Sequence, residues 1–159
     1  MIKPLLKQKR TKEPDLKKEG DKLYQELGRK VYSRCLVCGG DYSCLHHFVK
    51  KSQSTALRYD LENGIPICVN CHCSIHQGLN DTVVARITLI NGKEWLDSLE
   101  KKKREGAGLY YGKAWYREKI EYLILLCHVS RANNSRCFSR CFFAADFVAA
   151  VRFRCRSCI

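Results

Sequence analysis

Long apolar runs are missing from this sequence. No stretch reaches the roughly 18 continuous apolar residues of a membrane-spanning helix, and residues 1–20 contain no apolar signal-peptide region. Acidic side chains are also scarce, because 16 Asp and Glu stand against 29 Lys and Arg, which gives a formal net charge of +13. We therefore expect a soluble, cytoplasmic protein without a membrane partner, whose positive surface favours a phosphate polymer such as DNA.

The length of 159 residues fits one ordinary domain with appendages. Residues 1–20 are dominated by lysine and contain Pro4 and Pro14, so we predict a flexible basic arm. Apolar residues at helical spacing predict several helices within a domain over residues 21–126. These helices are expected over residues 21–32, 80–91, 93–103 and 115–126.

Residues 127–159 differ in composition from the rest of the chain. They contain five cysteines and six arginines but no lysine. We interpret them as an atypical, poorly ordered Cys/Arg-rich tail, as an added segment or as an out-of-frame extension. A second zinc site in this tail is a weaker alternative, because no fold is evident around its four suitably spaced cysteines, Cys137, Cys141, Cys155 and Cys158.

Two C-x-x-C pairs bracket the central segment of the chain. Cys35 and Cys38 form the first pair, and Cys68 and Cys71 form the second. Each pair can present two thiolates from a tight turn to one tetrahedral ion, and paired cysteines in a reducing compartment hold metal more often than they form disulfides. We predict a structural Zn²⁺ bound by all four cysteines, in preference to a chance pairing in a cysteine-rich chain.

Between and after these pairs the sequence predicts two short strands followed by a helix. The strands are expected over residues 44–49 and 64–68, and the helix begins near Val69. His72 and His76 share one face of this helix because they are four residues apart. The predicted order of elements is therefore β, β, α.

Four of the five histidines lie within this short segment. Neutral imidazole binds divalent metals and has a pKa near neutrality, so clustered histidines can hold an ion and move a proton. Adjacent residues of a strand point to opposite faces, which permits different roles for His46 and His47. A second structural metal site, or surface histidines without a role, is the simpler alternative.

The combined pattern CLVCGG, LHHFVKKSQS and LENGIPICVNCHCSIH resembles the HNH, or ββα-metal, endonuclease family. In that family a C-x-x-C pair, a His-His or Asp-His pair, an Asn and a C-x-x-C-H-x-x-x-H motif follow in this order. More weakly, the run from Phe48 to Asn63 is similar to the phage recombination nucleases called NinG or Rap. The resemblance covers residues 35–78 and implies an α+β fold, with a small zinc-braced, treble-clef-like ββα-metal core and flanking helices.

The resemblance also implies metal-dependent hydrolysis of DNA phosphodiester bonds, directed by DNA structure or related to phage recombination. His47 falls on the general-base position. Asn63 falls on a position that either fixes the loop orienting the base or joins the metal shell, and its alternative role is that of a turn residue before Gly64. Ligand positions for one catalytic divalent cation (Mg²⁺, Mn²⁺ or another transition metal) fall on His46, His72 and His76. No small-molecule cofactor is implied, and a homodimer is left open.

Basic side chains after the first strand are candidates for DNA contact. The candidates follow the strand, where backbone phosphates would lie, and are Lys50, Lys51 and Arg58. The alternative interpretation is that they form a solvated basic loop without DNA contact. The main rival function is a non-catalytic, zinc-finger-like DNA-binding module, which has no need of His47 and Asn63 beside a metal cluster. A protein-interaction zinc domain is a third alternative, and it leaves the charge of +13 unexplained.

Overall fold

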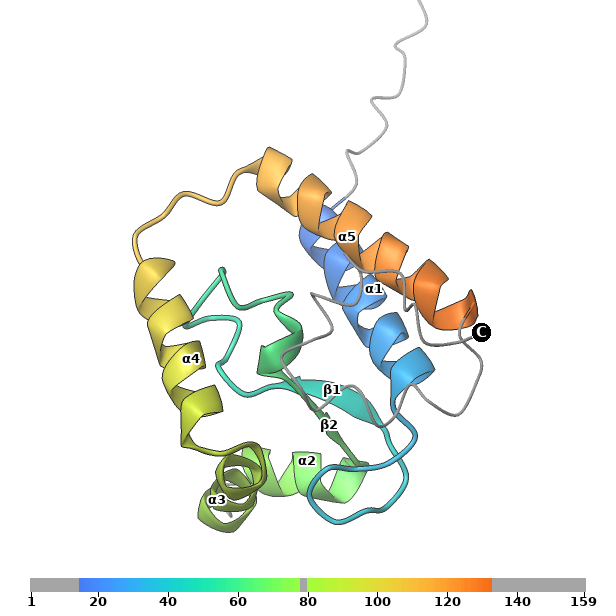
Figure 1. Cartoon of the computed structure of the whole chain (residues 1–159), viewed down its shortest axis with the longest axis vertical. Coiled ribbons are helices and arrows are strands. Elements are labelled where there is room, and N and C mark those ends of the chain that lie inside the picture. Colours follow the sequence, from blue (N-terminus) through green and yellow to red (C-terminus); the bar gives the residue numbers. More distant parts are fainter. Residues whose placement is uncertain (1–14, 78–79, 133–159) are drawn as a thin grey trace, which may run out of the picture.

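The computed structural model describes residues 15–77 and 80–132. Over these ranges the chain has an α+β fold, in which a two-stranded sheet lies between a pair of helices and a group of three further helices (Figure 1). The elements in chain order are α1 (Leu16–Val31), β1 (Cys44–His47), the 3₁₀ turn η1 (Leu61–Asn63), β2 (Gly64–Ile67), α2 (Val69–His76), α3 (Asn80–Asn91), α4 (Lys93–Glu105) and α5 (Lys113–Ala132). The predictions for residues 1–14 and for residues 133–159, including the alternative zinc site of Cys137, Cys141, Cys155 and Cys158, lie outside the described residues.

Helix α1 begins five residues earlier than the sequence pattern predicted. The side chain of Asp15 accepts hydrogen bonds from the backbone N–H groups of Lys17 and Lys18 and so caps the helix N-terminus. Leu16, the first helical residue, packs on the hydrophobic core. Residues 16–20 therefore belong to the folded domain, and the predicted basic arm was wrong in that part.

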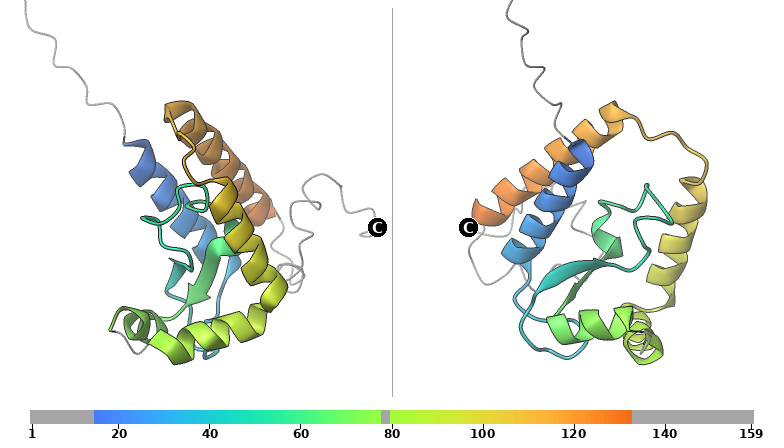
Figure 2. Two further views of the ribbon diagram at one scale, coloured as in Figure 1. Left: turned by 90° about the vertical axis from the view of Figure 1, so that its left-hand side faces the viewer. Right: turned by 180° about the vertical axis from the view of Figure 1, so that it is seen from behind.

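Helix α5 runs beside α1, as Figures 1 and 2 show from three directions. Their contact surface is a core of apolar side chains in which Leu123 and Leu126 are fully buried. The predicted boundary at residue 127 was wrong, because α5 continues to Ala132 and Cys127 is buried in the same core. Helical packing thus extends past the point where the composition changes.

Strands β1 and β2 pair in antiparallel register, with Cys44 opposite Ile67 and His47 opposite Gly64. On β1, the backbone N–H and C=O of Leu45 bind the side-chain amide of Gln25 on α1, at 2.9 and 2.8 Å. This amide stands in for a third strand, because a backbone pair left without a partner would be costly. The sheet is therefore attached directly to α1.

Both strands are shorter than predicted. The backbone N–H and C=O of Val49 bind the side chain of Asn63 instead of a neighbouring strand, so β1 ends before that residue. Cys68 is the N-cap of α2, so β2 ends at Ile67. The predicted β, β, α order is otherwise confirmed.

Helices α2, α3 and α4 come after the sheet in the chain and lie on the side of the sheet away from α5 (Figure 1). Ile65, Ile67 and Ile87 are buried together there, and Trp95 packs against both this cluster and the one around Leu99. The predicted helices after residue 80 are confirmed within two residues at each end, apart from α5. None of the described helices is long and apolar enough to cross a membrane.

The contact between α1 and α5 can be tested with two leucines of the same helix. We expect Leu123→Ala to lower the free energy of unfolding by about 2–5 kcal/mol, because it opens a cavity in the core. Leu125 is 50% exposed, so Leu125→Ala should change that free energy by less than about 0.5 kcal/mol. Urea unfolding followed by circular dichroism measures both, and equal effects would contradict the packing described.

Candidate metal centre

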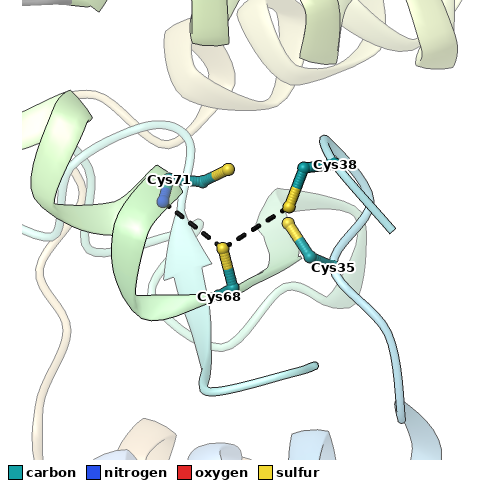
Figure 3. Close-up of side chains that lie close together, drawn as sticks. All are labelled: Cys35, Cys38, Cys68 and Cys71. Atoms are coloured by element: carbon teal, nitrogen blue, oxygen red, sulfur yellow. Dashed lines mark hydrogen bonds between the residues drawn. The ribbon is translucent and has the colours of Figure 1, made fainter. Parts of the chain in front are cut away.

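The four cysteines of the two C-x-x-C pairs converge at one end of the sheet (Figure 3). Their sulfur atoms all lie within 4.8 Å of one another, and the Sγ atoms of Cys38 and Cys68 are 3.6 Å apart. Four thiolates bound to Zn²⁺ at about 2.3 Å in tetrahedral geometry have sulfur–sulfur distances of about 3.8 Å. The cluster of Cys35, Cys38, Cys68 and Cys71 can therefore hold a structural metal such as zinc, as the spacing predicted.

Local backbone geometry brings the two cysteine pairs into position. Gly39 has a φ of 72°, a left-handed conformation that favours glycine. The chain reverses there, since the N–H of Gly39 donates to the carbonyl of Cys35 and the N–H of Cys35 donates to the carbonyl of Gly40. The second pair begins at the N-terminus of α2, where Cys68 Sγ accepts from the N–H of Cys71 at 3.4 Å.

The electrostatics of this cluster favour a cation. Burial raises the pKa of Cys35, but hydrogen bonds from the backbone N–H groups of Cys38, Cys68 and Val37 outweigh burial and lower that pKa to about 7. Burial and the neighbouring thiols raise the pKa of Cys71. Four close sulfurs cannot all ionise without compensation, and a bound metal ion supplies the compensating charge.

A second cluster is formed by three histidines from two elements. His46 lies on β1, and His72 and His76 lie one turn apart on α2. One ring nitrogen of each lies within 4.8 Å of the other two, and the Nε2 atoms of His72 and His76 are 3.0 Å apart. These nitrogens are close enough to bind a single ion, and the structure brings together all three histidines that the sequence grouped.

The environment of His46 and His72 favours their neutral form. Burial, followed by the charges of His72 and His76, lowers the pKa of His46 to about 4. Burial also lowers the pKa of His72, and the neighbouring His76 adds to this effect. A neutral imidazole retains the lone pair that binds a metal.

His47 lies on the opposite face of β1 from this cluster, as the alternation of strand side chains predicted. Its ring stacks on Tyr24 of α1, with centroids 4.9 Å apart, and its Nε2 is 2.8 Å from the carbonyl oxygen of Arg58. Burial lowers the pKa of His47, and the bond to Arg58 offsets this only in part. Because a carbonyl only accepts, Nε2 must carry the proton and Nδ1 must be the acceptor of the neutral ring.

Asn63 is fully buried in the 3₁₀ turn η1, directly before β2. Its Oδ1 accepts from the N–H of Val49, and its Nδ2 donates to the carbonyls of Val49 and Leu57. Both amide hydrogens are therefore used to fix the loop between the strands. This geometry matches the expected loop-fixing role and the turn position, and it does not bring Asn63 into either cluster.

The three basic residues predicted to contact DNA differ in their surroundings. Arg58 donates to the carboxylate of Asp21 from Nε and Nη2 at 3.0 and 2.7 Å, and Lys51 donates to the same carboxylate at 3.0 Å. Lys50 is exposed, and no ion pair joins it to an acidic side chain within the described residues. Of the three, Lys50 is the one left available to a phosphate.

The remaining cysteines of the ββα segment are outside both clusters. Cys44 is partly buried against the core around Ile67, and Cys73 is exposed. The sequence pattern did not predict that Tyr24 and Gln25 contact β1. Their spacing on one face of α1, together with Leu27 and Gly28, was a signal for a buried contact, but it did not indicate the partner.

No family model, curated protein or solved structure matches this chain. Function is therefore inferred from the side chains of the two clusters and from His47.

Zinc binding can be tested with two cysteines, the N-cap of α2 and a residue within α2. We expect one tightly bound zinc per chain, lost in Cys68→Ser together with the helical signal of the ββα unit, because a structural zinc contributes folding free energy on the order of 10 kcal/mol in isolated fingers. Cys73→Ser removes an exposed thiol outside the cluster and should keep wild-type zinc content. Elemental analysis and the thiolate-to-cobalt absorption of Co²⁺-substituted protein measure the site. Wild-type zinc content in Cys68→Ser would contradict the assignment.

Proposed function

We propose that this chain is a metal-dependent endonuclease of the HNH type, which hydrolyses DNA phosphodiester bonds. The observation that carries the proposal is the division of two adjacent histidines of β1. His46 meets His72 and His76 of α2 in a cluster of potential metal ligands, while His47 is held separately by Arg58 and Tyr24. A ligand set and an oriented base side by side are the requirements of metal-assisted hydrolysis.

In this proposal His46, His72 and His76 hold one divalent cation. Such a cation acts as a Lewis acid for the charge that develops on phosphate and leaving-group oxygens. The low pKa values of His46 and His72 favour this role, since neither imidazole has to lose a proton before it binds metal near neutral pH. The four-cysteine cluster has a structural role, because its four positions are all filled by protein.

His47 is the proposed general base. With Nε2 donating to the Arg58 carbonyl, Nδ1 is the atom that accepts a proton from the attacking water. The lowered pKa keeps the ring in its neutral, accepting form near neutral pH. Asn63 supports this arrangement indirectly, because it ties Val49 and Leu57, which lie at the two ends of the intervening loop.

A zinc-finger-like DNA-binding module without hydrolysis is the rival. The four-cysteine cluster and the net charge of +13 would suit both functions. A binding module gains nothing from a partly buried histidine whose tautomer is set by a backbone carbonyl, and this favours the enzyme.

The first test separates the enzyme from the binder. We expect wild-type protein to cut DNA in the presence of Mg²⁺ or Mn²⁺ and not in EDTA, and His47→Ala to cut about 10²–10⁴ times more slowly, because it loses the base. Zinc content, folding and DNA affinity should stay near wild type, since a base acts on the transition state. The assay uses supercoiled, linear, branched and single-stranded DNA in single-turnover conditions.

Two further histidine variants act as controls. His72→Ala should also lose activity, but excess divalent metal should restore part of it, which it should not do for His47→Ala. His128 lies exposed on α5, so His128→Ala should cut at the wild-type rate. If wild-type protein binds DNA and cuts no topology, or if His47→Ala retains full activity, the binding-module reading replaces this proposal.

A separate test concerns phosphate contact by Lys50. We expect Lys50→Ala to weaken DNA binding and to reduce the slope of log K against log salt by about 0.9, the value for one lost phosphate contact on duplex DNA. Lys101→Ala removes the same charge from α4, where Lys101 faces Glu105, and should leave the slope unchanged. Fluorescence anisotropy across a salt series measures the slopes, and equal slopes for wild type and Lys50→Ala would exclude the contact.

A further inference from the structure

Helix α1 binds the segment 58–60, which supports His47, at each of its three residues. The Asp21 carboxylate binds the Arg58 side chain, the Tyr59 hydroxyl donates to the carbonyl of Lys17 at 3.0 Å, and the Tyr24 hydroxyl donates to the carbonyl of Asp60 at 3.0 Å. Tyr24 also stacks on the His47 ring. The segment 58–60 therefore has little freedom to move relative to α1.

The Asp21–Arg58 pair is the strongest of these attachments. Two nitrogens of the guanidinium bind the two carboxylate oxygens, and Lys51 adds a third hydrogen bond to the same group. The Arg58 and Asp21 side chains are only 17% and 26% exposed. Bidentate, charge-assisted and partly buried pairs of this kind fix geometry far better than single exposed ion pairs do.

Arg58 has two partners that face different parts of the molecule. Its side chain is bound to Asp21, and its backbone carbonyl accepts the hydrogen bond from His47 Nε2. The bidentate bond to Asp21 anchors the Arg58 side chain on α1 and so limits how far the Arg58 backbone can move. That backbone carries the only acceptor that the described residues offer to the His47 Nε2. The position of the His47 ring thus depends on an acid that never touches it.

We propose that Asp21 is a positioning residue for the general base, acting through Arg58 to hold the His47 ring and its Nε2–H tautomer. This inference rests on the proposed function of His47. It assigns the Arg58 guanidinium to this support and leaves phosphate contact to other basic side chains. It also makes α1, which lies outside the ββα segment, part of the machinery of the site.

The test compares two aspartates that each pair with an arginine. Asp21→Asn removes the charge and one acceptor from the supporting pair. Asp41→Asn does the same to the Arg34–Asp41 pair, which is 69% and 91% exposed and has no contact with His47. Asp21→Glu keeps the carboxylate and tests for rescue.

For cleavage at saturating DNA, we expect Asp21→Asn to lower the single-turnover rate by about 10- to 100-fold, the usual effect of losing a residue that orients a catalytic group. KM should stay within about threefold of wild type. Asp21→Glu should recover most of the rate, and Asp41→Asn should match wild type. An unchanged rate in Asp21→Asn, or a rise in KM alone, would overturn the positioning role.

A second readout does not depend on cleavage. Nitrogen-15 NMR of the histidine rings at pH 8, where imidazole is neutral, should show the Nε2–H tautomer for His47 in wild type and Asp41→Asn, and a mixture of tautomers in Asp21→Asn. If Asp21→Asn loses its fold, Arg58→Lys asks the same question, because lysine keeps the charge and the carbonyl but not the bidentate fork.

The two readouts also separate this inference from the proposed function. Retention of the wild-type tautomer in both Asp21→Asn and Arg58→Lys overturns the positioning role, whether or not the protein cuts DNA. If these variants change the His47 tautomer while the wild-type protein cuts no DNA, the positioning contact is supported and the endonuclease proposal is refuted.

Discussion

The gathering of four cysteine sulfurs within 4.8 Å of one another is the constraint on which the ββα segment depends. Each strand has four residues, and α2 has eight residues of which none is buried. A hairpin of this size is marginal in water, and so is an isolated helix shorter than about 12 residues. The cluster joins the turn at Cys35 to the first turn of α2. The position of α2 against the sheet therefore follows from the sulfurs more than from apolar packing.

Two different supports meet at the histidines of β1. His46 faces α2, whose position depends on the cysteine cluster, whereas His47 faces α1, whose position depends on the apolar core shared with α5. Gln25 joins the two supports, because it binds the backbone of Leu45, the residue directly before the His46-His47 pair. Because side chains alternate along a strand, the imidazole rings of two adjacent histidines contact different parts of the molecule.

The parts of the site that the sequence predicted are those set by local geometry. The C-x-x-C spacing, the alternation of His46 and His47, and the i, i+4 relation of His72 and His76 each need only a few neighbouring residues. The support of His47 could not be predicted this way. Asp21 and Arg58 are 37 residues apart, and no periodicity links a helix side chain to a particular loop residue.

The domain boundaries that were predicted from composition were wrong at both ends. Lysines around Leu16 suggested a flexible arm, yet the Asp15 cap and the apolar stripe of α1 outweigh them. At the other end, the change to Cys and Arg after Leu126 suggested a new segment, but Cys127 fits the core as a small apolar side chain. Packing and capping decide where a helix begins and ends, and both depend on single residues that an average over a window hides.

Charge near His47 is balanced within the protein despite the large net charge. Asp21 pairs with Arg58 and Lys51, and Lys102 pairs with Asp60 and Glu62. Hydrogen bonds from Arg58 and Lys51 lower the pKa of Asp21 against the opposing effect of burial, so this acid is ionised near neutral pH. In the proposed endonuclease, a DNA phosphate that bound Arg58 would have to break both bonds of Arg58 to Asp21, and the support of His47 would then weaken. The proposed DNA contact and the proposed base are therefore compatible only if phosphates bind basic side chains outside this network.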